Sequence, residues 1–442
     1  MNTQPRRAVI TGIGLVCPLG SSPDALWEGL VARRSAVAEI DWLGDQNERT
    51  VVRFAAEARQ FRGEIDEFGA LDPQRKKAIR KGLKVMCREC QMGVAAAQMA
   101  LEDAGLVPSA LDPDRSGVSF GSDHMITMPD DFVEAVRACL NESGRFEFAR
   151  WAASGLPKMS PLWLLKYLPN MPASHLTIYN DLRGPNNSLT LREISSHAAI
   201  GDALHAIRRG VADVMVAGAT GSRVHPLKLV HAAQQEELAS TEGDPAAASR
   251  PFDLGRTGMV LGEGAGAVVV EEASRAAARG ATIHGEIVAS AVGVAVRRPL
   301  TADRRRAAAH VLDAVLREAG MRPEDVGHLH AHGLSTRRGD VEEAQAVADV
   351  FGSVVRRIPV VAAKANFGNL GAGSGAVELA ASLMALRRGN LFPVLNFNRP
   401  DPECPVAPVV DDSTPAGDAF ISLSITPQGQ AAAVLIRRAT AA

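Results

Sequence analysis

Two patterns of hydrophobic and polar residues alternate along the chain, one typical of buried strands and the other typical of amphipathic helices. Short apolar runs bounded by small residues predict buried strands, as at 8–13, where AVITGI is followed by Gly14. Longer stretches with an apolar residue every three or four positions predict helices. The predicted strands are 8–13, 118–122, 188–191, 213–218, 265–270, 326–332 and 358–362, with another beginning at 283, and the predicted helices are 23–34, 77–104, 194–209, 273–279, 302–319, 341–351 and 376–388. Continuously apolar strands that alternate with helices predict an α/β protein with a mainly parallel sheet covered on both faces.

One region interrupts this alternation. Residues 124–183 contain several prolines and no clear period, and we interpret them as an irregular insertion with short helices, serving as a lid or a partner surface. The strand–helix alternation resumes afterwards and is loosely repeated from residue 273. We therefore expect two duplicated halves, at 1–272 and 273–442.

Composition limits the classes of function. The chain has 442 residues, 46% of them hydrophobic, with 48 Lys+Arg against 50 Asp+Glu. These values are ordinary for a globular protein and exclude a disordered or fibrous chain. A net charge of −2 gives no electrostatic reason to bind nucleic acid or an anionic membrane. Neither is expected as a partner.

The cysteines and the apolar runs indicate a compartment. The five cysteines are an odd, sparse set, which favours a reducing environment over a disulfide framework. The start, MNTQPRR, lacks the apolar core of a signal peptide. No uncharged apolar run reaches the ~18 residues that span a bilayer. We expect a cytoplasmic protein.

Motifs for cofactors are incomplete. Gly12-Ile-Gly14 does not continue into GxGxxG, and no GxxxxGK[ST] loop is present. Cys87-x-x-Cys90 falls inside a predicted helix and has no second pair of cysteines, so we interpret it as two small helix residues rather than a metal site. No cofactor is expected.

Three histidines share one face of a predicted strand. His328, His330 and His332 alternate with apolar residues, which would allow them to bind a metal. No carboxylate or cysteine partner is obvious, so we expect no metal. The preferred interpretation is one functional histidine, His332 beside the Gly333 turn, with its two neighbours on the path to the surface.

Four motifs occur in a particular order: RRAVITGIGLVCPLG from Arg6, RPFDLGRTGMVLGEGAGAVVVEE from Arg250, HGLST from His332 with a following Gly-Asp, and Lys364 followed by GAVE. In this order they resemble β-ketoacyl-acyl-carrier-protein synthases, above all the elongating type II enzymes and the polyketide ketosynthases. The resemblance implies the thiolase fold, which has two duplicated halves in a five-layer αβαβα arrangement, assembled as a dimer.

The resemblance also implies roles for particular residues. Family members condense an acyl chain with a malonyl unit on acyl carrier protein, using a Cys at a strand-to-helix elbow, two His that stabilise an enolate, and a supporting Lys. His332 matches the first His, Lys364 the Lys, and Asn369 stands in place of the second His. Thr336 matches a contact to the pantetheine arm. The motifs also include Asp340 and Glu378, which we expect to be structural.

Besides Asn369, three positions depart from the family pattern. Glu193 falls at the nucleophile position of the elbow, and a carboxylate cannot form the stable thioester that condensation needs. Leu334 replaces the Thr that usually follows His-Gly. In the stretch anchored on Gly429, Pro427 falls at the gating Phe, whose backbone N–H completes an oxyanion hole. Proline has no N–H, and losing one such donor typically costs ~10²–10³ in rate.

Three functions remain open on these residues. The preferred one is a non-elongating subunit, like the chain-length factors of type II polyketide systems, which pairs with a Cys-bearing ketosynthase or forms a homodimer. Glu193 would then be structural, its carboxylate favoured by the helix dipole. A malonyl decarboxylase that uses His332 and Asn369 is an alternative, with Glu193 protonated by burial so that it imitates Gln. A hydrolase or acyl transferase with Glu193 as general base beside His332 is the third.

Arginine clusters are candidate contacts for an acidic carrier protein. They lie at 208–209, 304–306 and 337–338. Arg337 and Arg338 follow the turn assigned to the pantetheine arm and are therefore the best placed. Solvated surface arginine is the alternative interpretation of all three clusters.

Overall fold

The computed structural model describes residues 6–44, 50 and 52–439. Its centre is a large mixed sheet in the strand order β13-β12-β11-β14-β15-β8-β1-β7-β6-β4-β5. The strands are β1 (Ala8–Val16), β4 (Ser116–Ser122), β5 (Asn186–Leu189), β6 (Val214–Ser222), β7 (Leu261–Glu272), β8 (Gly285–Val294), β11 (His328–His330), β12 (Pro359–Val361), β13 (Ala407–Pro408), β14 (Ala419–Ile425) and β15 (Gln430–Arg437).

The expectation of a mainly parallel sheet is wrong for the middle strands. Neighbouring strands from β14 to β6 are antiparallel, whereas those on both outer sides are parallel. The strands β1, β6, β7 and β14 are buried at every position. A strand covered on both faces is apolar throughout in either direction, so the hydrophobic pattern does not reveal strand polarity.

The same strand order occurs twice. One half of the sheet runs β1-β7-β6-β4-β5. Without the two-residue edge strand β13, the other runs β8-β15-β14-β11-β12, so each uses its first, fifth, fourth, second and third strands in turn. The halves join where β1 pairs with β8, with Ala8 opposite Ile287. This repeat confirms the duplicated architecture, while the division of the chain at residue 272 stays a prediction.

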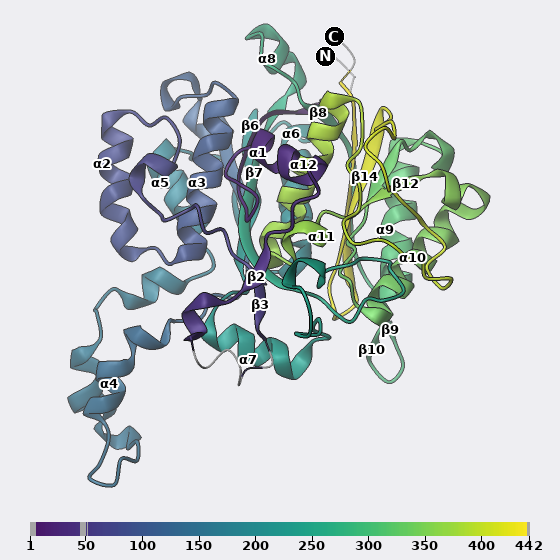
Figure 1. Cartoon of the computed structure of the whole chain (residues 1–442). Helices are drawn as coiled ribbons and strands as arrows, with labels where there is room; N and C mark the ends of the chain where they lie inside the picture. The colour runs from purple at the N-terminus through teal and green to yellow at the C-terminus, as the bar shows by residue number, and fades with distance from the viewer. Residues whose placement is uncertain (1–5, 45–49, 51, 440–442) are drawn as a thin grey trace.

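Helices separate and cover the two half-sheets. On one side α3 (Arg88–Asp103) packs on β1, β6 and β7, and on the other α9 (Arg304–Ala319) packs on β8 and β15, with α10 (Arg337–Phe351) beside it. Between the half-sheets lie α6 (Ser195–Arg208) and α12 (Ser374–Arg388). Figure 1 shows this succession from left to right. The five-layer αβαβα fold is confirmed.

The single helix predicted over 77–104 is wrong. The chain forms α2 (Pro73–Gly82), a 3-10 turn (Leu83–Val85) and then α3, with Cys87 as the residue before its first turn. The break lies where α5 (Met171–Asn180) approaches, since a Cβ on Gly82 would lie 1.8 Å from Tyr179 Oη. The helical spacing of apolar residues continues across this break, so the sequence pattern does not reveal it.

The insertion at 124–183 consists of short helices, as predicted. These include α4 (Val133–Ala138), several 3-10 turns and α5. α4 and the turns after it project from the body of the protein at the lower left of Figure 1. The remaining elements that bear on the site are β2 (Val37–Glu39), β3 (Phe54–Ala56), α1 (Pro23–Val31), α7 (Pro226–Gln235), α8 (Ala273–Ala278), β9 (Val296–Arg297), β10 (Thr301–Ala302) and α11 (Lys364–Phe367).

Candidate active site

A strained turn between β5 and α6 directs Glu193 into the interior. Arg192 has φ +55°, a left-handed conformation that costs a non-glycine residue about 1–3 kcal/mol. The backbone N–H of Leu191 donates to Ser195 Oγ at 2.9 Å, which fixes the turn at the start of α6. The Glu193 side chain is fully buried as a result.

The buried Glu193 carboxylate is held by two arginines and an amide. Its Oε1 forms an ion pair with Arg223 and accepts a hydrogen bond from Asn369 Nδ2 at 3.2 Å, and its Oε2 lies 3.4 Å from Arg192 Nε. Burial by itself would raise the pKa of Glu193, but the positive charges of Arg223 and Arg192 lower it to about 2. The carboxylate is therefore ionised at neutral pH. Arg223 also contacts Glu236, at 3.0 Å.

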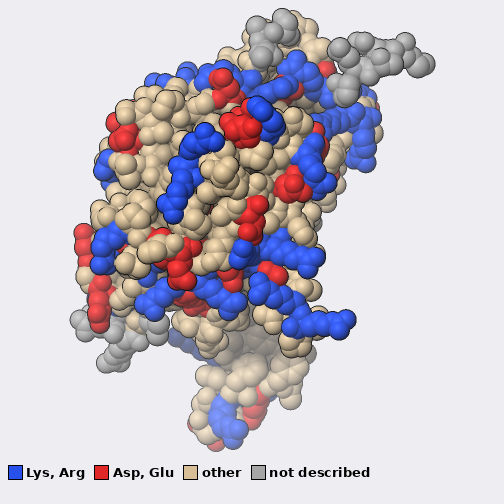
Figure 2. All heavy atoms as spheres, turned by 90° about the vertical axis from the view of Figure 1, so that its right-hand side faces the viewer, with Lys and Arg blue, Asp and Glu red and all other residues tan. Residues whose placement is uncertain are grey.

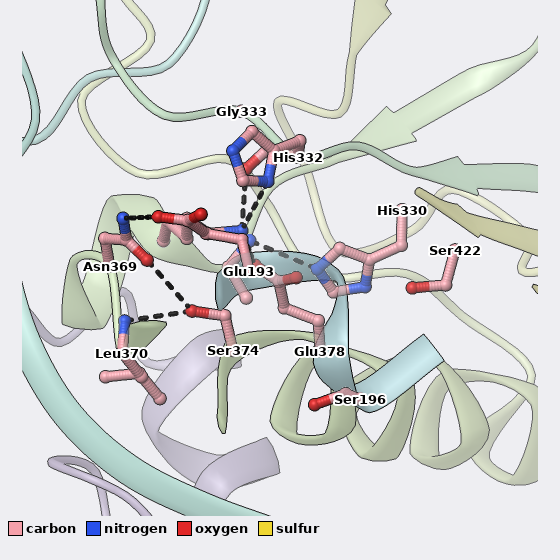
Figure 3. A network of polar contacts seen from close by, with 12 residues as sticks. Glu193, Ser196, His330, His332, Gly333, Asn369, Leu370, Ser374, Glu378 and Ser422 are labelled. Atoms are coloured by element: carbon pink, nitrogen blue, oxygen red, sulfur yellow. Dashed lines mark hydrogen bonds and ion pairs between the residues drawn. The ribbon is translucent and has the colours of Figure 1, made fainter. Parts of the chain in front are cut away.

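Asn369 has its orientation fixed from the other side. Its Oδ1 accepts hydrogen bonds from the backbone N–H of Gly371 at 3.0 Å and from Ser374 Oγ at 3.3 Å. The amide NH₂ group consequently faces Glu193 and the sulfur of Met259, 3.6 Å from Nδ2. Figure 3 shows Asn369 between Ser374 and Glu193. Both donor directions of this amide are occupied by the protein.

His332 lies across the site from Asn369, and Figure 3 shows its ring near Glu193. Lys364 Nζ donates to the backbone oxygen of His332 at 2.8 Å, lies 3.4 Å from its Nδ1, and is ion-paired with the buried Glu378. Burial lowers the pKa of His332 well below its ordinary value, and the positive charge of Lys364 adds to this effect. The imidazole is therefore neutral at pH 7.

Two buried carboxyl groups hold the backbone at His332 and in the turn that follows it. Glu343 accepts the backbone N–H groups of His332 at 2.6 Å and Gly333 at 2.9 Å. Asp340 accepts those of Thr336 at 3.1 Å and Phe252 at 2.9 Å. The sequence motif pointed to Asp340 but not to Glu343, which is the third residue after Asp340 on the inner face of α10.

The cleft that opens at His332 brings several of the expected residues together. Leu334, Thr336 and Pro427 line it, together with Glu236, Glu237, Met259, Arg304, Asp340, Glu343, Ile425 and Thr426. Gly429 lies in the tight turn between β14 and β15, with φ +82° and its amide donating to Thr426 O at 3.1 Å. Its place in the turn positions Pro427 at the cleft.

A second cavity, on the Glu193 side, is lined by charged residues that the sequence reasoning missed. Asp123, Arg192, Arg223, Lys228 and Glu236 are part of its lining. Burial raises the pKa of Asp123, although Lys228 and Arg223 oppose the shift. These residues come from different loops and carry no motif, and only their convergence in space reveals them.

The interpretation of His328 and His330 as neighbours on the path to the surface is wrong. Both side chains are fully buried. Ser382 Oγ lies 3.1 Å from His328 Nε2 and 2.8 Å from His330 Nδ1, and His328 Nδ1 lies 2.8 Å from Ala416 O. They are core histidines that interact with α12, because the strand continues into the middle of the sheet and not toward solvent. Among the described residues, no three His, Cys, Asp or Glu side chains are grouped so as to hold a metal.

The arginine clusters differ in their partners. Arg304 forms an ion pair with Glu342 and reaches the cleft, and Arg338 also pairs with Glu342, at 2.7 Å. Arg337 and Arg338 are exposed directly after Thr336. On the face that Figure 2 shows, basic and acidic side chains are interspersed, and basic ones project near its lower right edge. Arg208 instead pairs with Glu318 of α9.

Comparison with known proteins identifies the class. The beta-ketoacyl synthase N-terminal domain model matches residues 6–276 and the C-terminal domain model matches residues 284–398. The chain therefore belongs to the β-ketoacyl synthase family. It is 33% identical over 407 residues to a 3-oxoacyl-[acyl-carrier-protein] synthase 2 of Synechocystis sp., covering 91% of both chains. A protein of the same name from Coxiella burnetii is 33% identical over 402 residues, again with 91% of both chains covered.

Solved structures agree with this assignment. A β-ketoacyl synthase from Burkholderia phymatum superposes with a TM-score of 0.84 at 28% identity, covering 98% of this chain and all of that one. The ishigamide ketosynthase/chain length factor gives a TM-score of 0.82 at 24% identity, covering 99% of this chain and all of the other, and shows the shared fold. In the described part of the chain, no helix has the length and apolarity needed to cross a membrane.

Proposed function

We propose that this chain is a non-elongating ketosynthase-type subunit of fatty acid or polyketide biosynthesis, which works beside a Cys-bearing ketosynthase as a chain-length factor does. The observation that carries the proposal is the buried, ion-paired Glu193 at the elbow. Its carboxylate cannot hold an acyl group as a stable thioester. The five cysteines all fall within the described residues, and none of them lines the cleft at His332.

The geometry counts against decarboxylation by this chain. An enolate needs hydrogen-bond donors where its negative charge develops, and the Asn369 amide is already bound to Glu193. Two unit charges 4 Å apart repel by about 4 kcal/mol at an effective dielectric of 20. The pKa of about 2 keeps Glu193 ionised, so it does not imitate Gln.

The same pKa counts against Glu193 as a general base. A base works best when its pKa lies near the working pH, and Glu193 is several units below it. Its two carboxylate oxygens lie against Arg223 and Arg192. These contacts favour a structural role for Glu193.

The second cavity also favours a subunit that holds no acyl chain of its own. Arg223, Asp123 and Lys228 line the space beside Glu193. An apolar chain placed there would take water away from charged groups and give no hydrogen bonds in return, which is unfavourable. We infer that the growing chain is held by the partner.

Exposed apolar side chains support pairing with another ketosynthase. In the projecting insertion Phe148 is 76% exposed, and Leu156 and Leu162 are each more than half exposed. The edge strand β5 is exposed at Asn186 and Asn187. Apolar patches and unpaired strand edges are typical of interaction surfaces. We propose a heterodimer through this side of the molecule, with a homodimer as the alternative outcome.

An acyl carrier protein is the second partner that we propose. Arg337 and Arg338 are exposed beside Thr336, which lines the cleft. Basic side chains at the mouth of a cleft would attract an acidic carrier protein. Salt screens charges, so this attraction should weaken at high ionic strength. The proposed location for these encounters is the cytoplasm.

The first experiment follows malonyl-loaded acyl carrier protein by intact mass during incubation with the folded protein alone. The proposal expects the malonyl carrier to remain unchanged. Conversion to acetyl carrier, lost in His332→Ala, would establish a decarboxylase instead. Release of free carrier, lost in Glu193→Gln, would establish hydrolysis.

The second experiment co-expresses the chain with a Cys-bearing ketosynthase from a type II system. We expect co-purification and a change in that partner's product length. Phe148→Glu should weaken the complex, whereas Val211→Glu, which changes a similarly apolar exposed residue outside the insertion, should not. A stable homodimer that does not exchange with such partners would contradict the proposal.

A further inference from the structure

Three sulfur atoms meet at the start of α3. Their residues line neither the cleft at His332 nor the second cavity, although Asp123 of that cavity is two residues from Met125. Cys87 precedes the first turn of α3, Cys90 lies within that turn, and Met125 follows β4. The two Sγ atoms are 3.7 Å apart, and each lies 3.8 Å from Met125 Sδ. The three atoms thus form a nearly equilateral triangle.

We propose that this triangle is a binding site for a thiophilic monovalent metal ion, with Cu(I) as the expected occupant. Thiolate and thioether sulfur are soft ligands that select Cu(I) over hard cations. The point equidistant from the three sulfur atoms lies about 2.2 Å from each, close to the ~2.3 Å of a metal–thiolate bond. A metal ion fits there with little movement of the side chains.

The surroundings suit a three-coordinate ion. Cys90 and Met125 are buried, while Cys87 is half-buried and gives access from solvent. The Lys166 carbonyl closes the site, since it accepts the backbone N–H of Cys87 at 3.3 Å and lies 3.7 Å from Cys90 Sγ. A structural zinc ion would require four nitrogen or sulfur ligands, and this cluster supplies three.

The positive end of α3 favours the negative charge that bound thiolates carry. α3 has 16 residues, and both cysteines lie at its N-terminal end. When the metal binds, each thiol loses its proton as its metal–sulfur bond forms, and the thioether contributes a lone pair. The metal keeps its oxidation state, and up to two protons are released. Because protons are released when the thiolates bind the metal, binding should strengthen as the pH rises.

The test is a Cu(I) titration of the reduced full chain without oxygen, in competition with a chromophoric Cu(I) chelator. We expect one tightly held ion, and X-ray absorption should show three sulfur neighbours at about 2.3 Å. Cys87→Ser and Cys90→Ser should each remove the tightly held ion.

Conservative variants separate metal binding from packing. Met125→Leu keeps an apolar side chain of similar size and should weaken Cu(I) binding by about tenfold or more, because even residues behind the ligands have effects of that size. Two control variants should leave Cu(I) binding unchanged. They are Met92→Leu, at a buried methionine of α3, and Cys404→Ser, at a buried cysteine elsewhere in the fold.

Two results would overturn the proposal. One is equal Cu(I) affinity in the wild type and Met125→Leu. The other is that the reduced wild type binds Cu(I) no more tightly than Cys87→Ser does. Neither result depends on whether the chain acts as a non-elongating subunit.

Discussion

The carboxylate of Glu193 and the guanidinium of Arg223 form an ion pair in which neither side chain is more than 9% exposed. Arg223 follows β6 and Glu193 precedes α6, so the pair joins two neighbouring strand–helix connections. Arg223 also binds Glu236, which precedes the loop to β7. The turn before α6 is thereby tied by ion pairs to α7 and to the end of β6.

Removal of this carboxylate should destabilise the fold. Glu193→Ala leaves Arg223 buried with one partner fewer, and breaking a buried pair on one side typically costs about 3–5 kcal/mol. We expect a loss of about 3 kcal/mol, the lower value, because Glu236 remains. Urea unfolding would measure it. Glu193→Ala/Arg223→Met should recover part of the loss, and a change below about 1 kcal/mol in Glu193→Ala would refute the role given to the pair.

The low pKa of Glu193 predicts a loss of stability in acid. The folded pKa of about 2 lies below the ordinary value of 4.5. The carboxylate therefore contributes stability that is fully present above pH 4.5 and is lost as the pH falls toward 2. Glu193→Gln should show a shallower decline of unfolding free energy over this window than the wild type. Parallel curves for the two proteins would contradict the ion pair.

Glu343 should have the opposite dependence. Burial and the nearby Asp340 raise its pKa to about 8, despite two backbone N–H donors. A carboxyl group whose folded pKa is raised contributes stability that is present below its unfolded pKa and is lost as the pH rises through the folded value. Glu343→Gln should flatten the decline in stability between about pH 4.5 and 8. Denaturant midpoints across this range would test it, with Glu142→Gln, at an exposed position, as control.

Asn369→Asp should be more harmful than Asn369→Ala. The aspartate would place a second negative charge about 3.2 Å from Glu193 Oε1, where the amide now donates. Repulsion between unit charges at this separation is about 5 kcal/mol at an effective dielectric of 20. We expect the two variants to differ by at least about 2 kcal/mol near pH 7 and to converge in acid. Equal stabilities at pH 7 would show that the contact does not form.

Gly429→Ala should cost more than a left-handed glycine alone. Gly429 has φ +82°, and a Cβ there would lie 2.6 Å from Ala295 O. Gly280 has φ +66° with no atom within 4 Å of an added Cβ, so Gly280→Ala measures the backbone strain by itself, about 1–2 kcal/mol. Thermal unfolding should show a larger loss of stability in Gly429→Ala than in Gly280→Ala. An equal loss would mean that the close contact with Ala295 O adds nothing to the backbone strain.

The amino-acid sequence by itself determined the family, the duplicated α/β fold and the residues His332, Lys364 and Asn369, because these lie in short motifs whose order survives in the chain. It also predicted several of the buried strands, such as β1, β6 and β7, since their apolar runs are local. Strand direction was beyond its reach, because a strand buried on both faces has the same composition in parallel and antiparallel sheets.

Only the tertiary structure decided the charge and the hydrogen-bond partners of Glu193. Glu193 could be a protonated imitation of Gln, a general base or a structural anion until Arg223, Arg192 and Asn369 were placed around it. Those residues are distant in sequence and acquire their effect on its pKa only through proximity in a buried environment. The same reason applies to Glu343, and to Met125 beside the two cysteines. Charge and coordination depend on distances that the order of residues does not contain.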